Sequence, residues 1–384
     1  MRIKYSIRAI LFCIALSFLT GCSTLPGLDY SRVWVSQGAP FVIANSRTEK
    51  GWGYLSHPRV VAFPDGMLVA LYYLGGDSAK QQVSADLAKL GPAVSRDGGR
   101  TWALGEAEIP ENRRKFFCNT WSGVLSAWGG TVYMDGDMLR YVGGLGHLMI
   151  CRKDGRMEGP FMSPVDGPDA DPVPCGVYMG SNTVLMAGRY APKGGKSSFF
   201  LYRSSDGGHS FKEDQIIAGP NDAPWGNEGP NEGSMVRLDS SNLVAVMRTG
   251  QIQENPWVRP TSAASMLSAR SIDGGKTWEK RRLPIPGVFP KLLLMSNGVL
   301  VCAFGRPGNN LMFSTDGGKT WGHEVALTAA DGKTTGYVDI VEVAPNRLLA
   351  VYDMYNTDLG GIWLWEPHTV NGVLGRFVDV KRLW

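Results

Sequence analysis

The chain has 384 residues, a formal net charge of +4, and 49 glycines, 12 tryptophans and 13 tyrosines. Charges of both signs are mixed along the sequence without a block of Lys and Arg, which argues against nucleic acid as the main partner. The abundance of Gly and aromatic residues is typical of many short strands joined by turns. The length suits two ordinary domains or one closed array of repeats.

Residues 1–22 have the features of a targeting segment. Three basic residues precede Ala9–Leu19, an apolar stretch too short to span a bilayer. The segment ends in Leu19-Thr20-Gly21-Cys22, which resembles the lipobox of bacterial lipoproteins; an ordinary signal peptide is the alternative. The resemblance implies cleavage before Cys22 and attachment to a membrane of the bacterial cell envelope through acyl chains on Cys22. Ser23 favours the outer membrane, and residues 23–30 form a tether.

The cysteines give no fixed framework. Once the signal is removed, four remain beyond Cys22, so three full disulfide pairings are open and the sequence selects none. Their spacing does not resemble a zinc site, and we predict no metal or other cofactor. These four cysteines are Cys118, Cys151, Cys175 and Cys302.

The rest of the chain, residues 31–384, repeats one pattern in which a polar turn leads into an alternating apolar strand. Six such units are separated by roughly 50 to 65 residues, near the length of one four-stranded propeller blade. We therefore expect a single all-β domain, a six-bladed β-propeller, closed by pairing a C-terminal strand such as 361–366 with the N-terminal region. The strands of the units are 67–72, 131–134, 183–187, 243–247, 299–303 and 348–352.

An eight-residue phrase, Ser-x-Asp-Gly-Gly-x-Thr/Ser-Trp/Phe, begins at four serines: Ser95, Ser204, Ser271 and Ser314. Asp-Gly-Gly favours a tight turn. The Asp carboxylate can accept hydrogen bonds from amides of the turn, and the Ser and Thr hydroxyls can form further hydrogen bonds within it. The aromatic residue anchors the turn to the sheet below. Each copy has a single carboxylate, which argues against calcium. The phrase resembles the Asp-box, or BNR repeat, of the sialidase superfamily. That resemblance implies a six-bladed propeller whose boxes are structural turns without substrate contact.

A propeller binds ligands at one end of its channel, on residues just outside the strand cores. Glu232 precedes one apolar strand and Arg248 closes the next, sixteen residues later, in an arrangement similar to the sialidase Glu and Arg; Glu228 is an alternative to Glu232. Arg306 follows a third apolar strand and matches another Arg of the sialidase triad. Tyr337, about thirty residues further on, matches the sialidase nucleophile.

The resemblance implies an exo-acting, retaining glycoside hydrolase that cleaves a terminal sialic acid or related acidic sugar from a glycan. A neutral phenol suits this chemistry, because a carboxylate nucleophile would be repelled by the carboxylate on the anomeric carbon of the sugar. In this scheme Tyr337 attacks, Glu232 accepts its proton, and Arg248 and Arg306 clamp the substrate carboxylate through charge-assisted hydrogen bonds.

The chain departs from the sialidase pattern in the first blade. Ser56 stands where the first Arg of the triad is expected. Arg59 is near but on the opposite side of a regular strand, so either a bulge turns it into the site or the clamp has two arginines. His57 is left as an acid/base or substrate contact. The acid/base Asp is Asp77, which follows a strand and two glycines, or else Asp86.

Two other functions remain open at this stage. The missing first Arg favours a hydrolase or lyase for a different acidic sugar, such as another ulosonic acid or a uronic acid. A noncatalytic surface propeller that binds glycans is the other alternative. The sequence indicates neither the natural substrate and its linkage nor the oligomeric state.

Overall fold

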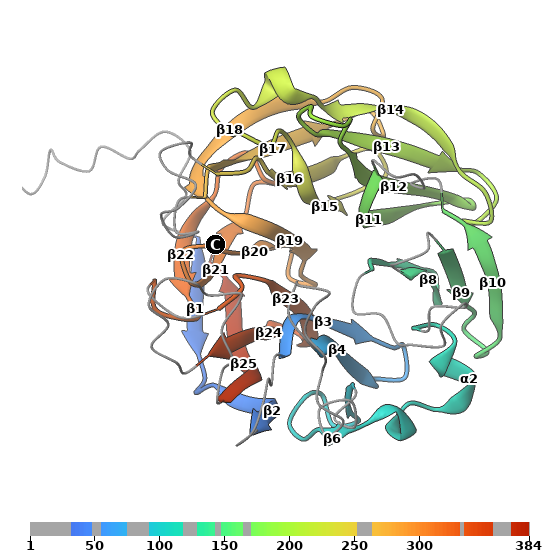
Figure 1. Cartoon of the computed structure of the whole chain (residues 1–384), viewed down its shortest axis with the longest axis vertical. Helices are drawn as coiled ribbons and strands as arrows, with labels where there is room; N and C mark the ends of the chain where they lie inside the picture. The colour runs from blue at the N-terminus through green and yellow to red at the C-terminus, as the bar shows by residue number, and fades with distance from the viewer. Residues whose placement is uncertain are drawn as a thin grey trace, which may run out of the picture.

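The structure is a computed structural model that describes residues 32–47, 55–74, 92–117, 129–142, 147–163, 170–251, 263–330, 334–355 and 370–383. The predicted signal segment with Cys22, and also Asp77, Asp86 and Cys118, lie outside these residues. In the described ranges six antiparallel sheets are arranged in a ring (Figure 1), so the prediction of an all-β, six-bladed β-propeller is confirmed.

Each of the first five blades is a four-stranded sheet whose strands follow one another in the chain. Blade 1 contains β3 (Leu55–Ala62), β4 (Leu68–Leu74), β5 (Ala93–Ser95) and β6 (Ala103–Leu104). Blade 2 contains β7 (Thr131–Met134), β8 (Asp137–Val142), β9 (His147–Cys151) and β10 (Met157–Met162). Blade 3 contains β11 (Ala170–Gly180), β12 (Thr183–Tyr190), β13 (Ser198–Ser204) and β14 (Lys212–Ala218).

Blade 4 contains β15 (Asn231–Arg237), β16 (Leu243–Arg248), β17 (Ser265–Ser271) and β18 (Glu279–Pro286). Blade 5 contains β19 (Val288–Leu294), β20 (Leu300–Gly305), β21 (Asn309–Ser314) and β22 (Gly322–Ala326). The helices that the structure describes are short and lie between strands: 3-10 turns at Glu106–Glu108 and Pro220–Asp222 and α2 (Glu111–Arg114). In this part of the chain no helix reaches the length and apolar character needed to cross a membrane.

Blade 6 closes the ring by joining both ends of the propeller. It combines β23 (Val338–Ala344), β24 (Arg347–Tyr355) and β25 (Val370–Arg382) with β1 (Val33–Gln37) and β2 (Phe41–Arg47), which both pair with β25 (Figure 1). Closure by a C-terminal strand against the N-terminal region therefore occurs, through β25. The segment 361–366 named from the sequence lies outside the described residues.

Five of the six turn-strand units mark the second strand of their blades, which are β4, β12, β16, β20 and β24. In blade 2 the unit at 131–134 is instead the first strand, β7. Its partner β8 begins after a two-residue turn at Asp135-Gly136, where both residues have positive φ, 34° and 96°. Asp-Gly turns of this kind join hairpin strands directly. The count of six blades was correct even though this unit is one strand early.

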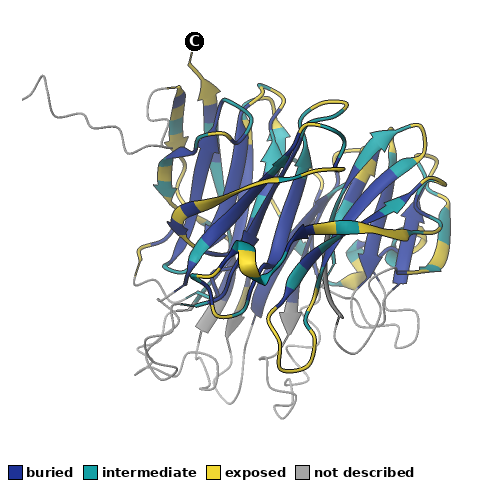
Figure 2. Ribbon diagram, turned by 90° about the horizontal axis from the view of Figure 1, so that it is seen from above, coloured by how far each residue is buried: buried dark blue, intermediate teal, exposed yellow. Residues whose placement is uncertain are grey.

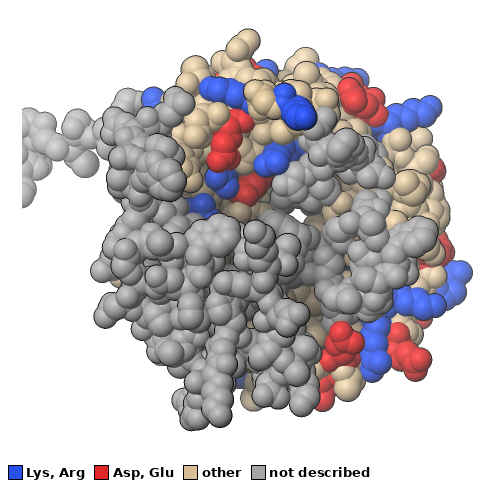
Figure 3. All heavy atoms as spheres, in the orientation of Figure 1, with Lys and Arg blue, Asp and Glu red and all other residues tan. Residues whose placement is uncertain are grey.

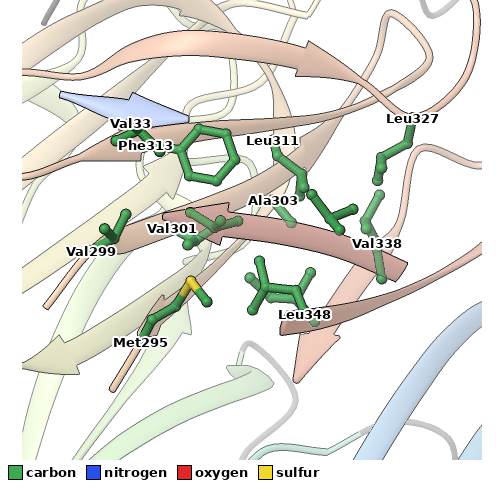
Figure 4. Packing of buried hydrophobic residues seen from close by; sticks show 14 of the residues in the cluster. Val33, Met295, Val299, Val301, Ala303, Leu311, Phe313, Leu327, Val338 and Leu348 are labelled. Carbon is green, nitrogen blue, oxygen red and sulfur yellow. The ribbon is translucent and has the colours of Figure 1, made fainter. Parts of the chain in front are cut away.

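Six of the seven hydrophobic clusters in the described part of the chain lie one between each pair of neighbouring blades. The seventh, smaller cluster contains Ala263, Val288, Phe289 and Tyr337. Figure 2 shows buried residues running along most strands and exposed residues on turns and on parts of the outer strands, such as β14 and β18. Between blades 5 and 6, for example, Val301 and Phe313 pack with Val338 and Leu348, and Val33 of the N-terminal strand joins them (Figure 4). Each blade therefore depends on both neighbours to bury its two faces.

The four octapeptide phrases form equivalent turns between the third and fourth strands of blades 1, 3, 4 and 5. In the first, the Ser95 hydroxyl donates to Asp97 Oδ1 at 2.8 Å, Gly99 N donates to Ser95 Oγ, and the Thr101 hydroxyl donates to Asp97 Oδ2 at 2.6 Å. The other three repeat this arrangement. These hydrogen bonds, chiefly the one from the Thr101 hydroxyl, hold the pKa of Asp97 well below its usual value.

The second glycine of each turn packs against the preceding blade. A Cβ at Gly99 would lie 2.8 Å from Leu349 of blade 6, and one at Gly208 would lie 2.8 Å from Leu139 of blade 2. The two remaining turns make the same kind of contact with blades 3 and 4. The repeated turns therefore join neighbouring blades, in line with a structural role.

Replacing Gly275 with Ala should destabilise the fold more than replacing Gly274 with Ala. Both glycines have positive φ, 88° and 74°, so both variants carry the same backbone strain. A Cβ at Gly275 would also lie 3.1 Å from Leu201 and 3.3 Å from Leu243, whereas one at Gly274 meets no atom within 4 Å. We expect urea unfolding to show an additional loss of about 1–3 kcal/mol in Gly275→Ala. Equal losses would mean that the contact between the blades adds nothing.

Candidate active site

Four residues predicted from separate parts of the sequence meet where the first, inner strands of blades 4 and 6 begin and the second strands of blades 4 and 5 end. Glu232, Arg248 and Tyr337 are buried, and Arg306 is half-buried. The Tyr337 hydroxyl donates to Glu232 Oε1 at 2.7 Å, and Arg248 Nη1 donates to Glu232 Oε2 at 2.9 Å. The guanidinium carbon of Arg306 lies 5.7 Å from the centroid of the Tyr337 ring. Tyr337 directly precedes β23, Arg306 directly follows β20, and Arg248 ends β16.

Irregularities near the starts of three inner strands aim side chains at Tyr337. The pairing register shifts in β3 between Ser56 and Arg59, in β15 around Glu232, and in β19 after Val288. Each of these three irregular segments contains one non-glycine residue with positive φ: His57 at 52° in β3, Glu232 at 32° in β15 and Phe289 at 48° in β19. The rings of His57 and Phe289 lie 4.3 and 4.5 Å from that of Tyr337. Bulges and strained backbone of this kind recur beside functional sites, where they redirect side chains.

The bulge in β3 brings Arg59 to the site, which was one of the two possibilities left open by the sequence. Ser56 pairs with Tyr73 and Arg59 pairs with Leu71, so three steps along β3 match two along β4. The extra residue puts Arg59 on the face that Ser56 occupies. The Arg59 guanidinium carbon lies 3.8 Å from the centroid of the Phe289 ring and 5.9 Å from that of Tyr337.

Arg248 is held between two carboxylates. Its Nη1 binds Glu232, and its Nη2 binds Glu228 Oε1 at 2.8 Å. Glu228, the alternative considered from the sequence, therefore contacts Arg248, and Glu232 is the glutamate that contacts Tyr337. Around Tyr337 lie the guanidiniums of Arg59, Arg248 and Arg306 and the carboxylate of Glu232.

The protonation states of Tyr337 and Glu232 are set by their surroundings. Burial, followed by the negative charge of Glu232, raises the pKa of the Tyr337 phenol well above its usual value. Burial also opposes ionisation of Glu232, but the charge of Arg248 and the hydrogen bond from Tyr337 outweigh it and keep the pKa of the carboxyl below its usual value. The resting site thus contains a neutral phenol hydrogen-bonded to an ionised carboxylate, as base-assisted attack requires.

His57 lies against the edge of the Tyr337 ring as a neutral imidazole. Burial, with the positive charges of Arg59 and Arg306, lowers the pKa of His57 to about 3. Its Nδ1 lies 2.8 Å from the Ser56 hydroxyl. At neutral pH the His57 ring is uncharged and has no imidazolium proton to donate. This charge state favours a contact role for His57 over a role as general acid.

The segment before Tyr337 is packed tightly against Arg306. A Cβ at Gly305 would lie 2.0 Å from the Gly336 carbonyl oxygen, and one at Gly336 would lie 2.7 Å from Arg306 Cγ. Arg306 Nε donates to the Thr335 carbonyl at 2.9 Å. The two glycines therefore permit the close approach that brings Arg306 of blade 5 beside Tyr337 of blade 6.

The central channel adjoins this group. Arg59, Phe289 and Gly233 line a cavity of about 460 Å³ that continues along the inner strands. Seen down the channel, acidic and basic side chains lie side by side next to the central opening (Figure 3). Among the described residues, no three His, Cys, Asp or Glu side chains gather in a way that would hold a metal ion. The described cysteines, Cys151, Cys175 and Cys302, are free thiols.

Comparison with known proteins identifies the fold. No family model matches the sequence, and no curated protein matches it. A Dyadobacter fermentans protein of unknown function is 19% identical, with a TM-score of 0.62 over 93% of this chain and 100% of its own. The GH93 α-L-arabinofuranosidase of Fusarium graminearum, solved with arabinobiose, is 12% identical, with a TM-score of 0.56 over 89% and 98%.

Sialidases share the same architecture. The Trypanosoma rangeli sialidase, solved with the inhibitor DANA, is 13% identical, with a TM-score of 0.51 over 88% of this chain. This chain spans 60% of the length of that sialidase. At these identities the likeness establishes the fold that this chain shares with sialidases and with an arabinofuranosidase.

Sequence reasoning missed two residues of the group. Phe289 stacks between Arg59 and Tyr337, and Asp353 binds the backbone on both sides of the site. Phe289 starts an inner strand, the same location that singled out Glu232. Asp353 lies near the end of a second strand, the same location that singled out Arg248. Applying both positional rules to every blade would have found them. Asp77, the predicted acid/base residue, lies outside the described residues.

Proposed function

We propose that this chain is an exo-acting, retaining glycoside hydrolase for a terminal acidic sugar, with sialic acid as the first candidate. The observation that carries the proposal is the 2.7 Å hydrogen bond from the buried Tyr337 phenol to Glu232, with three guanidiniums around it. In the proposed reaction Tyr337 Oη attacks the anomeric carbon and its proton passes to Glu232. The bond to the leaving oxygen breaks as that oxygen takes a proton, for which Asp77 remains the candidate donor.

The substrate carboxylate is assigned chiefly to Arg59 and Arg306. The positive charge of Arg248 is paired with Glu232 and Glu228. Arg59 and Arg306 donate to the carbonyls of Pro58 and Thr335, and their guanidiniums flank the Tyr337 ring at 5.9 and 5.7 Å. Arg59 would then take over the part of the first Arg that Ser56 lacks. Arg248 would act mainly by keeping Glu232 ionised, with a weaker contact to substrate than the sequence suggested.

A second candidate keeps the mechanism and changes the sugar. The charge pattern of this site differs from that of the sialidase arginine triad in two ways. Ser56 stands where the first arginine is expected, and the charge of Arg248 is paired with Glu228. A related ulosonic acid or a uronic acid is the alternative substrate class.

A panel of aryl glycosides tests the proposal. It should contain an α-sialoside, a second ulosonide, a uronide and a neutral arabinofuranoside. The proposal predicts turnover of at least one acidic member and little turnover of the arabinofuranoside. Preference for the arabinofuranoside would contradict the assignment of the arginines to a carboxylate, and binding without turnover of any member would favour the noncatalytic alternative.

The pH profile of kcat/KM should retain activity to an unusually low pH. Glu232 must be ionised to accept the proton, and its pKa lies below the ordinary value, so activity is full above that pKa and is lost as the pH falls through it. We expect the acid limb below about pH 4.3, the ordinary glutamate value. An acid limb near pH 6.5 would instead indicate that ionisation of a histidine controls turnover.

A further inference from the structure

Asp353 of β24 binds two separate segments of the site from behind. Its carboxylate is fully buried and accepts hydrogen bonds from the Thr334 hydroxyl at 2.6 Å, Thr335 N at 2.8 Å and the Thr335 hydroxyl. It also accepts a hydrogen bond from His57 N at 3.0 Å. The threonines belong to the segment directly before Tyr337, and His57 lies in the bulge that presents Arg59.

A second carboxylate secures the other end of the same bulge. Asp339 Oδ2 accepts a hydrogen bond from Val60 N at 3.1 Å, and Asp339 is itself buried in β23. The bulge in β3 thus has one backbone amide bound on each side, His57 N by Asp353 and Val60 N by Asp339. Both carboxylates come from blade 6, so blade 6 fixes the irregular part of blade 1 across the contact between the last and first blades.

We propose that Asp353 is a positioning residue that sets Tyr337 and Arg59 in register with each other. The catalytic importance of this positioning rests on the proposed function. The hydrogen bonds of Asp353 do not depend on that function. The Asp353 carboxylate binds the segment before Tyr337 through Thr335 and the bulge that presents Arg59 through His57. A displacement of Asp353 would therefore move both Tyr337 and Arg59. Misplacement by about 1 Å is enough to reduce turnover by about 10²-fold.

Replacing Asp353 with Asn tests the arrangement sharply. The carboxylate accepts one backbone amide on each oxygen, Thr335 N on Oδ1 and His57 N on Oδ2. An asparagine amide has one oxygen, and its NH₂ group cannot accept, so either orientation loses one of the two backbone amides. The fold keeps nearly the same side-chain volume, while the link between the two segments is broken.

The experiment combines kinetics with a probe that does not need turnover. Tyr337 is replaced by 3-fluorotyrosine, and the ¹⁹F resonance of this residue is compared in the full chain with and without Asp353→Asn. We expect a shifted or broadened resonance and a kcat about 10²-fold lower. Asp379→Asn is the matched control, because Asp379 pairs with Arg347 on the outside of the same blade; it should change neither.

A milder variant keeps the test decisive where Asp353→Asn fails to fold. Thr335→Val removes only the hydroxyl donor to Asp353, and Thr335→Ser keeps it. We expect a shifted ¹⁹F resonance and reduced kcat in the Val variant, with both restored toward wild type in the Ser variant. An unchanged resonance in folded Asp353→Asn or Thr335→Val would overturn the inference. A shifted resonance in a protein that hydrolyses no acidic glycoside would sustain the positioning contacts and count against the proposed function alone.

Discussion

Tyr337→Phe should lower kcat at least about 10³-fold while leaving the fold in place, because the phenolic oxygen is the proposed nucleophile. The substitution keeps the ring that packs against His57 and Phe289. It removes the donor to Glu232 Oε1, which leaves a buried carboxylate oxygen with one hydrogen bond fewer. We therefore expect a loss of stability of about 1–3 kcal/mol alongside the loss of activity.

The control for this prediction is Tyr72→Phe in β4. The Tyr72 hydroxyl is buried and makes no hydrogen bond to any residue that the structure describes. Its removal should leave kcat unchanged and stability unchanged or slightly improved. Turnover by Tyr337→Phe at the rate of the Tyr72→Phe control would exclude Tyr337 as the nucleophile.

Glu232→Gln should lower kcat by about 10²–10⁴-fold, because the amide cannot take the proton of Tyr337. The acid limb of the pH profile should disappear with it, since that limb is assigned to Glu232. Steady-state kinetics across the pH range measures both effects. Substrate binding should suffer less than kcat, because the three guanidiniums remain.

Glu228→Gln provides a matched comparison. It removes the same charge from the same arginine, since Arg248 Nη2 donates to Glu228 and Nη1 donates to Glu232. Glu228 binds Arg248 and Asn231, whereas the Tyr337 hydroxyl donates to Glu232, so the Glu228 variant should keep most of the activity. Equal losses in the two variants would mean that charge balance at Arg248, rather than proton transfer by Glu232, accounts for the effect.

The six-bladed ring could be predicted because the sequence signals that specify it are short-range. A polar turn followed by an alternating strand is a local signal, and its spacing along the chain gave the number of blades. Tyr337, Glu232, Arg248 and Arg306 were predicted to share one site because they stand just outside apolar strands and match the sialidase pattern. Inner strands begin, and second strands end, at the same end of a propeller, so polar residues at those points converge.

The bulges could not be predicted, because a register shift is defined only by the partner strand. Nothing in Ser56-His57-Pro58-Arg59 alone distinguishes a regular strand from one with an extra residue, and this difference decides which face Arg59 occupies. The closing strand β25 was missed for another reason. Gly372 and Gly375 interrupt its apolar pattern, and its stability comes from pairing with β1, β2 and β24.

The most direct test of the central claim is to stop turnover of an active acidic glycoside and identify the modified peptide by mass spectrometry. The proposed mechanism predicts a glycosyl adduct on the peptide that contains Tyr337, attached through its phenolic oxygen, and no adduct in Tyr337→Phe. An adduct on a carboxylate, or release of the sugar with inverted configuration and no adduct at all, would contradict it.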